Sequence, residues 1–365
     1  MKHALLHALQ AGKGGLDETF GPLVQHWRRA GPPDLRTYCG FGTPHAVTVK
    51  GRVLRQYDFQ PGTPSDSAWL NFWRIILRLL SRELSGVPVV GYLKSTEARA
   101  TTSREGYFEL RFSLPEPLCA AWHTAQVTLP DHAEHGSVPV RVVGVADFGI
   151  ISDLDDTVIR TRAHQLWQML ETVLFENSRT RLPFAGVGEL YHALARGPDG
   201  RGDNPVFYVS SSPWNLYGLI WRFLNKREVP LGPLLLRDWN LQTLAGSHDT
   251  HKLEAIQQMM TTYPDLPFVL IGDSGQEDPE IYREAARRFP GRVRAIYIRN
   301  VTGGRRQTEV VKLRGELEAE GVDLKLVPDS LSAAQHAQAT GLIAPGALPK
   351  VTAAVEEDRA AHGRY

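Results

Sequence analysis

The sequence predicts an α/β protein with a mostly parallel sheet, preceded by a smaller β-sandwich-like domain. From about residue 146 onward, short apolar segments alternate with helical ones, which is the pattern of βαβ units. Residues 41–145 instead hold short runs of alternating apolar and polar residues, as in an antiparallel sandwich. A third observation is that the apolar run 148–152 ends in carboxylates, where α/β proteins place their ligands.

Composition restricts the class of protein. The chain has 365 residues, of which 42% are hydrophobic and 22% charged, as in soluble globular proteins. A net charge of +1 argues against a strongly basic nucleic-acid surface, so no nucleic-acid partner is expected. Two cysteines form no disulfide framework, and neither a signal peptide nor a membrane-spanning apolar run is evident. We therefore expect a cytoplasmic protein.

The N-terminal part is expected to contain a helical lead-in over residues 1–40 and then the sandwich-like domain 41–145. Its predicted strands are 46–54, 106–112, 125–129 and 138–145. Residues 68–84 interrupt them with an amphipathic helix that carries Arg on its polar face and two Trp at one end. Such a helix either lies in a membrane interface or packs on a neighbouring sheet, which is the commoner role. The first interpretation predicts peripheral contact with the inner membrane face.

The C-terminal part is expected to form one catalytic domain over residues 146–342. Its further predicted strands are 204–210, 267–273, 293–298 and 322–327, and its helices are 163–176, 187–196, 214–226, 251–261, 278–288 and 305–320. A closing helix is predicted at 333–342. Residues 343–365 are rich in Ala, Pro and charges, so they are predicted to be a loose tail.

Four groups of polar residues stand at ends of these predicted elements. They are Asp153, Asp155 and Thr157 after the first strand; Ser210 and Ser211 at the end of the next; Lys252 at the start of a helix; and Asp273 and Asp278 within residues 272–278. Each signal alone is weak, because serines and aspartates often cap helices and lysines are usually solvated. Since the carboxyl ends of parallel strands meet at one sheet edge, all four groups are expected to lie together.

Each residue type answers a need of phosphoryl transfer. One carboxylate can attack phosphorus and hold it as an aspartyl-phosphate, while a second exchanges protons with the leaving group and water. Carboxylates from another strand can hold Mg²⁺, and a hydroxyl and an ammonium group can bind the remaining phosphoryl oxygens. A calcium loop is the competing interpretation, but the apolar residues after Thr157 do not supply alternating oxygen ligands.

The amino-acid sequences of these segments resemble those of a known family. Residues 149–157, 208–217, 251–252 and 271–282 are similar to the phosphatidate phosphatases of the actin-patch-protein type and their bacterial relatives, within the haloacid dehalogenase superfamily. The resemblance covers residues 146–342. It implies a Rossmann-like haloacid dehalogenase domain, and the short stretch between Thr157 and Ser210 leaves room only for a minimal cap.

The resemblance also implies roles for individual residues. Asp153 would be the nucleophile and Asp155 the general acid and base; Ser210 and Lys252 would hold the phosphoryl group, with Thr157 and Ser211 beside them. Which serine of 210–212 is the clamp stays open. Mg²⁺ would be held by Asp153, the backbone carbonyl of Asp155, and Asp273, with Asp278 supporting the site.

The leading hypothesis is thus a Mg²⁺-dependent phosphatidate phosphatase that releases diacylglycerol and phosphate. One alternative keeps the mechanism and changes the substrate to another phospholipid, a metabolite or a phosphoprotein. A second alternative is a membrane- or partner-binding module, against which the intact Asp153 and Asp155 argue. The oligomeric state is left open.

Overall fold

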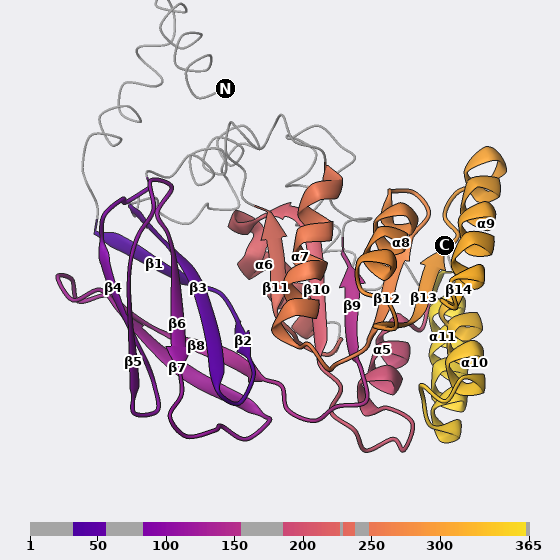
Figure 1. Cartoon of the computed structure of the whole chain (residues 1–365), viewed down its shortest axis with the longest axis horizontal. Coiled ribbons are helices and arrows are strands. Elements are labelled where there is room, and N and C mark those ends of the chain that lie inside the picture. The colour runs from indigo at the N-terminus through magenta and orange to yellow at the C-terminus, as the bar shows by residue number, and fades with distance from the viewer. Residues whose placement is uncertain (1–31, 56–82, 155–184, 227–228, 238–247, 363–365) are drawn as a thin grey trace, which may run out of the picture.

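The computed structural model describes residues 32–55, 83–154, 185–226, 229–237 and 248–362 (Figure 1). The predicted lead-in up to residue 31, most of the amphipathic helix 68–84 and the predicted helix 163–176 lie outside these residues. Within the described chain, an N-terminal sheet stands beside a C-terminal sheet that is flanked by helices (Figure 1). The α/β class and the parallel C-terminal sheet are therefore confirmed.

The N-terminal part forms one eight-stranded sheet, antiparallel except for the parallel pair β2 and β8. Its strands are β1 (Pro33–Thr37), β2 (Gly40–Gly42), β3 (Ala46–Arg55), β4 (Pro88–Leu93), β5 (Thr96–Thr101), β6 (Tyr107–Ser113), β7 (Trp122–Thr128) and β8 (His135–Val142). The sheet curls around its own apolar core: Gly91 of β4 faces Leu110 and Phe112 of β6 so closely that a Cβ there would overlap both side chains. The predicted sandwich of two sheets is not confirmed, because these strands pair into a single curled sheet.

Two boundaries differ from the prediction. Residues 33–37 form a strand rather than part of a helical lead-in, because they pair with β3. Strand β2, which also pairs with β3, begins at Gly40, the last residue of the predicted lead-in. Glu83 forms an antiparallel bridge with Leu54, so the described end of 68–84 is extended and not helical. In both places the backbone is extended because it pairs with another strand, and local sequence periodicity does not reveal such pairing.

The C-terminal sheet has six parallel strands in the order β11-β10-β9-β12-β13-β14. They are β9 (Gly149–Asp153), β10 (Val206–Pro213), β11 (Leu234–Arg237), β12 (Phe268–Asp273), β13 (Val293–Arg299) and β14 (Leu324–Val327). Counted along the chain this is the order 3-2-1-4-5-6 of a doubly wound sheet. Its central strands are nearly continuous apolar runs because both faces are covered. The short strand β11 was not predicted.

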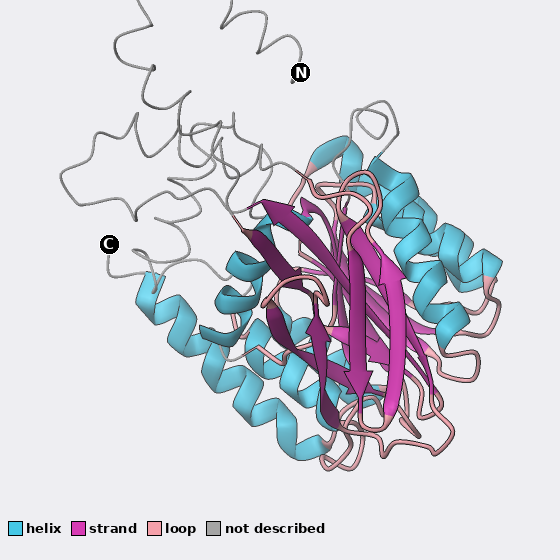
Figure 2. Ribbon diagram, turned by 90° about the vertical axis from the view of Figure 1, so that its left-hand side faces the viewer, coloured by secondary structure: helices cyan, strands magenta, loops and turns pink. Residues whose placement is uncertain are grey.

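Helices cover both faces of this sheet, as Figure 2 shows. The helices are α5 (Val187–Arg196), α6 (Tyr217–Lys226), α7 (His248–Thr262), α8 (Asp278–Arg288), α9 (Gly304–Ala319), α10 (Ser330–Ala339) and α11 (Leu348–His362), with 3-10 turns η3 (Trp214–Leu216) and η5 (Pro345–Ala347). One core contains residues of α5, α6, α10 and α11, and the core on the other face contains residues of α7, α8 and α9. No described helix is long and apolar enough to cross a membrane.

The prediction of a loose tail after residue 342 is wrong. Helix α11 packs against α5 and α10, with Val351 and Val355 buried. Asp358 accepts a hydrogen bond from the backbone N–H of Gly186, and Arg359 pairs with Asp329 at the start of α10. The C-terminal helix therefore belongs to one of the two layers that flank the parallel sheet.

Candidate active site

The candidate site lies where the order of the parallel sheet reverses. Strand β9 is central: β10 and β11 follow it on one side, and the chain then crosses to place β12 on the other. Beyond the carboxyl ends of strands flanking such a switch point, α/β sheets form their ligand-binding crevice. Asp153 is the last residue of β9 and Asp273 the last of β12, so topology alone brings these two carboxylates to the crevice.

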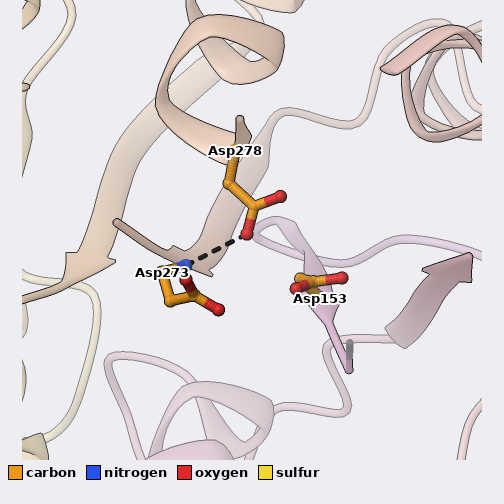
Figure 3. Close-up of side chains that lie close together, drawn as sticks. All are labelled: Asp153, Asp273 and Asp278. Carbon is orange, nitrogen blue, oxygen red and sulfur yellow. Dashed lines mark hydrogen bonds between the residues drawn. The ribbon is translucent and has the colours of Figure 1, made fainter. Parts of the chain in front are cut away.

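Three carboxylates meet there (Figure 3). Asp153, Asp273 and Asp278 each offer an oxygen, and these oxygens all lie within 4.8 Å of one another. Asp278, the first residue of α8, is completely buried, and its Oδ2 accepts the backbone N–H of Asp273 at 3.0 Å. Asp273 Oδ1 in turn accepts the N–H of Gly275 at 2.6 Å. Backbone donors thus hold two of the three carboxylates in fixed orientations.

Lys252 joins this group from α7. Its ammonium Nζ lies 2.8 Å from Asp153 Oδ1, 2.9 Å from Asp278 Oδ1 and 3.1 Å from Gln276 Oε1, and only 3% of the residue is exposed. A buried ammonium is stable only when it is paired: Lys252 donates hydrogen bonds to Asp278 and Gln276 and forms an ion pair with Asp153. The predicted neighbourhood of Lys252 and the acidic residues is therefore what the structure has.

The crowding of carboxylates affects their protonation. Burial raises the pKa of Asp273, and the nearby charge of Asp278 raises it further; the N–H of Gly275 and the charge of Lys252 oppose the rise. The carboxylates of Asp153, Asp273 and Asp278 outnumber the ammonium of Lys252 and the nearby guanidinium of Arg299, so the site keeps an excess of negative charge. Such a site favours the binding of a cation.

Strand β10 is longer than predicted and includes all three serines. Ser210, Ser211 and Ser212 all belong to the strand and are buried, and the N–H of Ser212 donates to Ser210 Oγ at 3.0 Å. Val209 pairs with Asp153 across the ladder, so Ser210 is one residue beyond the level of Asp153. This register is compatible with the predicted clamp role of Ser210 and Ser211 and does not choose between them.

Asp155 and Thr157 lie outside the described residues. Their predicted roles as acid and base and as phosphate ligand stay predictions.

Several residues of the site were not predicted. Gln276 binds Lys252, although it stands inside the acidic segment that the sequence singled out. Arg299 ends β13 opposite Asp273 in the ladder; burial lowers its pKa to about 10, and the charge of Asp153 opposes that effect. Ser152 shares a 2.6 Å hydrogen bond with the buried Tyr191 hydroxyl, directly before Asp153. The position of Arg299 at a strand end was the one signal that could have found it.

The donor set fits Mg²⁺. All three converging groups are carboxylates, and hard cations of this kind prefer oxygen ligands. Among the described residues these three form a cluster with metal-ligand spacing, and no Cys or His thiol or imidazole belongs to it. The described residues that could hold the ion are thus Asp153, Asp273 and Asp278.

Comparison with known proteins finds similarity in the part of the chain that contains this site. Residues 148–300 match the family model described as "Phosphatidate phosphatase APP1, catalytic domain", which confirms the resemblance inferred from the motifs over this part of the chain. The Saccharomyces cerevisiae "Phosphatidate phosphatase APP1" is 29% identical over 181 residues, which are 48% of this chain and 30% of the yeast protein. An uncharacterized protein of Schizosaccharomyces pombe is 32% identical over 166 residues, 44% of this chain and 26% of its own length.

The chain thus matches less than a third of the length of these curated relatives. Among solved structures, a carbohydrate acetylesterase from Xanthomonas citri aligns over 77% of this chain and 73% of its own, with 11% identity and a TM-score of 0.28. A likeness at that level supports no statement about fold or function.

Proposed function

We propose, from the match of residues 148–300 to the phosphatidate phosphatase catalytic domain, that this chain is a Mg²⁺-dependent phosphatidate phosphatase. It hydrolyses phosphatidate to diacylglycerol and phosphate through an aspartyl-phosphate. The observation that carries the proposal is the buried group of Asp153, Lys252, Asp273 and Asp278 at the switch point of the sheet, inside the matched segment.

The proposed fold of the catalytic part is a haloacid dehalogenase-like domain with a minimal cap. Its support is the doubly wound order of the six strands, with the nucleophile candidate Asp153 on the first strand and Asp273 on the fourth.

Asp153 is the proposed nucleophile. Its carboxylate oxygen forms a bond to phosphorus while the bond from phosphorus to the glycerol oxygen breaks, and Asp155 donates its proton to that oxygen. Water then attacks phosphorus and passes a proton to Asp155, which releases phosphate and restores Asp153. The ammonium of Lys252, 2.8 Å from Asp153 Oδ1, holds the carboxylate in one orientation and offsets the charge of the incoming phosphate.

The remaining phosphoryl oxygens have candidate donors on neighbouring elements. Ser210 and Ser211 on β10, with Thr157, are proposed to hold them through hydroxyl groups. Both serines are buried in the strand, and the Ser210 hydroxyl oxygen accepts the N–H of Ser212, so this hydroxyl loses little freedom when substrate binds.

Mg²⁺ is the proposed cofactor. Asp153, Asp273 and the backbone carbonyl of Asp155 would hold it, with Asp278 beside them. When bound, the ion neutralises phosphate charge and lessens the repulsion between the phosphate and the carboxylates. Asp278 also accepts the backbone N–H of Asp273 and binds Lys252, so it contacts both a proposed metal ligand and the proposed phosphate-binding lysine.

The lipid substrate and the cellular place are further proposals. Phosphatidate is named by the yeast relative and the matched family, and residues 68–84 are proposed to give peripheral contact at the inner membrane face from a cytoplasmic location.

The test is phosphate release from phosphatidate in mixed micelles and from soluble phosphomonoesters, with and without Mg²⁺. Wild type and Asp153→Asn are compared, because this nearly isosteric change removes the nucleophilic charge and keeps the fold, which circular dichroism checks. We expect Mg²⁺-dependent release, strongest on phosphatidate, to fall by about a thousandfold or more in the variant. Undiminished release by Asp153→Asn would refute the mechanism, and release only from soluble esters would refute the lipid substrate.

A further inference from the structure

The segment 273–280, here called the acidic loop, joins β12 to α8 and carries Asp273, Gln276 and Asp278. Arg306, in the first turns of α9, spans this loop from outside. Its Nε donates to the carbonyl oxygen of Ser274 at 3.1 Å, and its Nη2 donates to the carbonyl oxygen of Gln276 at 2.7 Å. The same guanidinium holds both oxygens of Glu280 at 2.6 and 2.8 Å. The Arg306 side chain thus bonds the loop near its start, at Ser274, and at its end, at Glu280.

These bonds connect Arg306 to the catalytic groups in two steps. Gln276, whose carbonyl Arg306 holds, binds Lys252 Nζ through its side-chain oxygen, and Lys252 binds Asp153 and Asp278. Ser274, held by the other branch, follows Asp273 directly. Its N–H also donates to the carbonyl of Arg299 at 2.9 Å. The loop backbone is therefore held between β13 and α9.

The acidic loop needs such support. It places two buried carboxylates within reach of a third, and their mutual repulsion favours any movement that separates them. A guanidinium with a planar fork restrains two carbonyls and a carboxylate at the same time, whereas an ammonium has no such geometry. Burial works against the charge of Glu280, but the hydrogen bond and charge of Arg306, a backbone hydrogen bond and the charge of Arg283 together keep the pKa of Glu280 below its ordinary value.

We infer that Arg306, together with Glu280, is a positioning residue that holds the acidic loop in the geometry that binds the divalent cation and aligns Lys252. The inference rests on the proposed function for the identity of the cation. The restraint of the loop itself is a property of the metal-free protein.

A purely structural tie between helices is the alternative, and the chain supplies its control. Arg283 of α8 pairs with Glu316 of α9 at 2.8 Å, and its side chain is 27% exposed, close to the 24% of Arg306. Both arginines thus join α8 or its loop to α9. Within the part of the chain that the structure describes, Arg283 bonds Glu316 and not the backbone of the acidic loop, so Arg283→Lys weakens the tie between the helices and spares the loop.

The experiment compares wild type, Arg306→Lys and Arg283→Lys by amide hydrogen exchange of the metal-free chain. The amides followed are those of Asp273, Ser274 and Gly275, whose N–H groups bond inside the loop or to Arg299. We expect Arg306→Lys to raise their exchange about tenfold, as for the loss of a charge-assisted hydrogen bond, and Arg283→Lys to change it less than about twofold. Calorimetric titration with MgCl₂ alone should show a similar loss of affinity in Arg306→Lys only.

Turnover at raised Mg²⁺ concentration distinguishes a positioning role of Arg306 from a general loss of folded protein. If Arg306 acts through metal affinity, raising Mg²⁺ restores the turnover of Arg306→Lys toward the wild-type value, which a misfolded protein cannot do. Unchanged exchange in Arg306→Lys, or an equal rise in Arg283→Lys, overturns the inference. If wild type binds no Mg²⁺, the proposed cofactor fails, while the exchange comparison still decides the role of Arg306.

Discussion

Gly272 precedes Asp273 in β12, and its missing side chain leaves the space that the Asp278 carboxyl group occupies. A Cβ at Gly272 would lie 2.9 Å from both Cβ and Cγ of Asp278. Asp278 has no room to move, because it is completely buried and both of its oxygens are bonded. Here a glycine is required by close approach and not by backbone conformation.

We therefore predict that Gly272→Ala displaces Asp278, lowers stability by about 1–3 kcal/mol and weakens Mg²⁺ binding by about tenfold or more. Chemical denaturation and calorimetric titration measure the two effects. Gly315→Ala is the control, because Gly315 is exposed within α9 with nothing within 4 Å of its Cβ position. That change should stabilise the chain by about 0.5–1 kcal/mol. Wild-type metal affinity in Gly272→Ala would show that Asp278 does not support the site.

At the scale of single elements, the start of α10 shows how the C-terminal helix is attached. Asp329 is the N-cap of α10: its Oδ1 accepts the backbone N–H of Ser332 at 2.8 Å. Its other oxygen binds Arg359 of α11 at 2.7 Å. Burial alone would raise the pKa of Asp329, but the bonds from Ser332 and Arg359 outweigh burial, so the pKa lies below its ordinary value of 3.8.

Asp329→Ala should destabilise the chain by about 1–2 kcal/mol at neutral pH, since it removes a helix cap. The folded pKa of Asp329 is depressed, so its contribution is present above the unfolded pKa of 3.8 and is lost as pH falls through the folded value. The difference in unfolding free energy between wild type and variant should therefore shrink below about pH 4. Denaturant unfolding at several pH values measures it, with the exposed Glu357→Ala as a control that changes little. A difference that persists at low pH would contradict the role of the carboxylate.

At the scale of the whole molecule, the N-terminal part contacts the turn that follows the strand with the serines. The ring of Tyr38 stacks on Trp214, with centroids 4.3 Å apart, and the N–H of Cys39 donates to the Tyr217 hydroxyl at 2.7 Å. Arg52 of β3 donates to Asn215 Oδ1 at 3.1 Å. These contacts all reach the turn that follows Ser210–Ser212. The curled sheet therefore helps to hold the proposed phosphate clamp.

We predict that Arg52→Met lowers the unfolding free energy by about 2 kcal/mol and reduces turnover. Arg52 is only 8% exposed, and it also bonds Glu83 and the carbonyl of Glu105, so its loss deprives partly buried acceptors of this donor. Arg99→Met is the matched control, because its side chain is 76% exposed and, among the described residues, its ion pair is with Glu97 on the same strand. Its effect should stay within about 0.5 kcal/mol. Equal effects of the two changes would show that the contact between the sheets contributes nothing.

Much of this architecture could be predicted from the sequence. The helices 187–196 and 278–288 begin and end as predicted, and the strands near 149, 268 and 293 fall within a residue or two of their predicted bounds. Periodicity determined them, because an amphipathic helix and an apolar strand each repeat a local pattern. The rule that places polar residues at the ends of parallel strands predicted that Asp153 and Asp273 lie together, and Lys252 was expected beside them from the start of a helix.

Other features were decided only by tertiary structure. The composition of the tail predicted no regular structure. Helix α11 nevertheless forms, because Val351 and Val355 pack on apolar residues of α5 and α10. The short strand β11 is recognisable only through its partner β10. Arg306 belongs to no motif, and Gln276 had no role assigned to it within the acidic segment; their importance comes from contacts with residues far along the chain. The sequence by itself determined the local elements and the residue types of the site; tertiary contacts decided which of those residues meet, because burial and pairing are properties of partners and not of single segments.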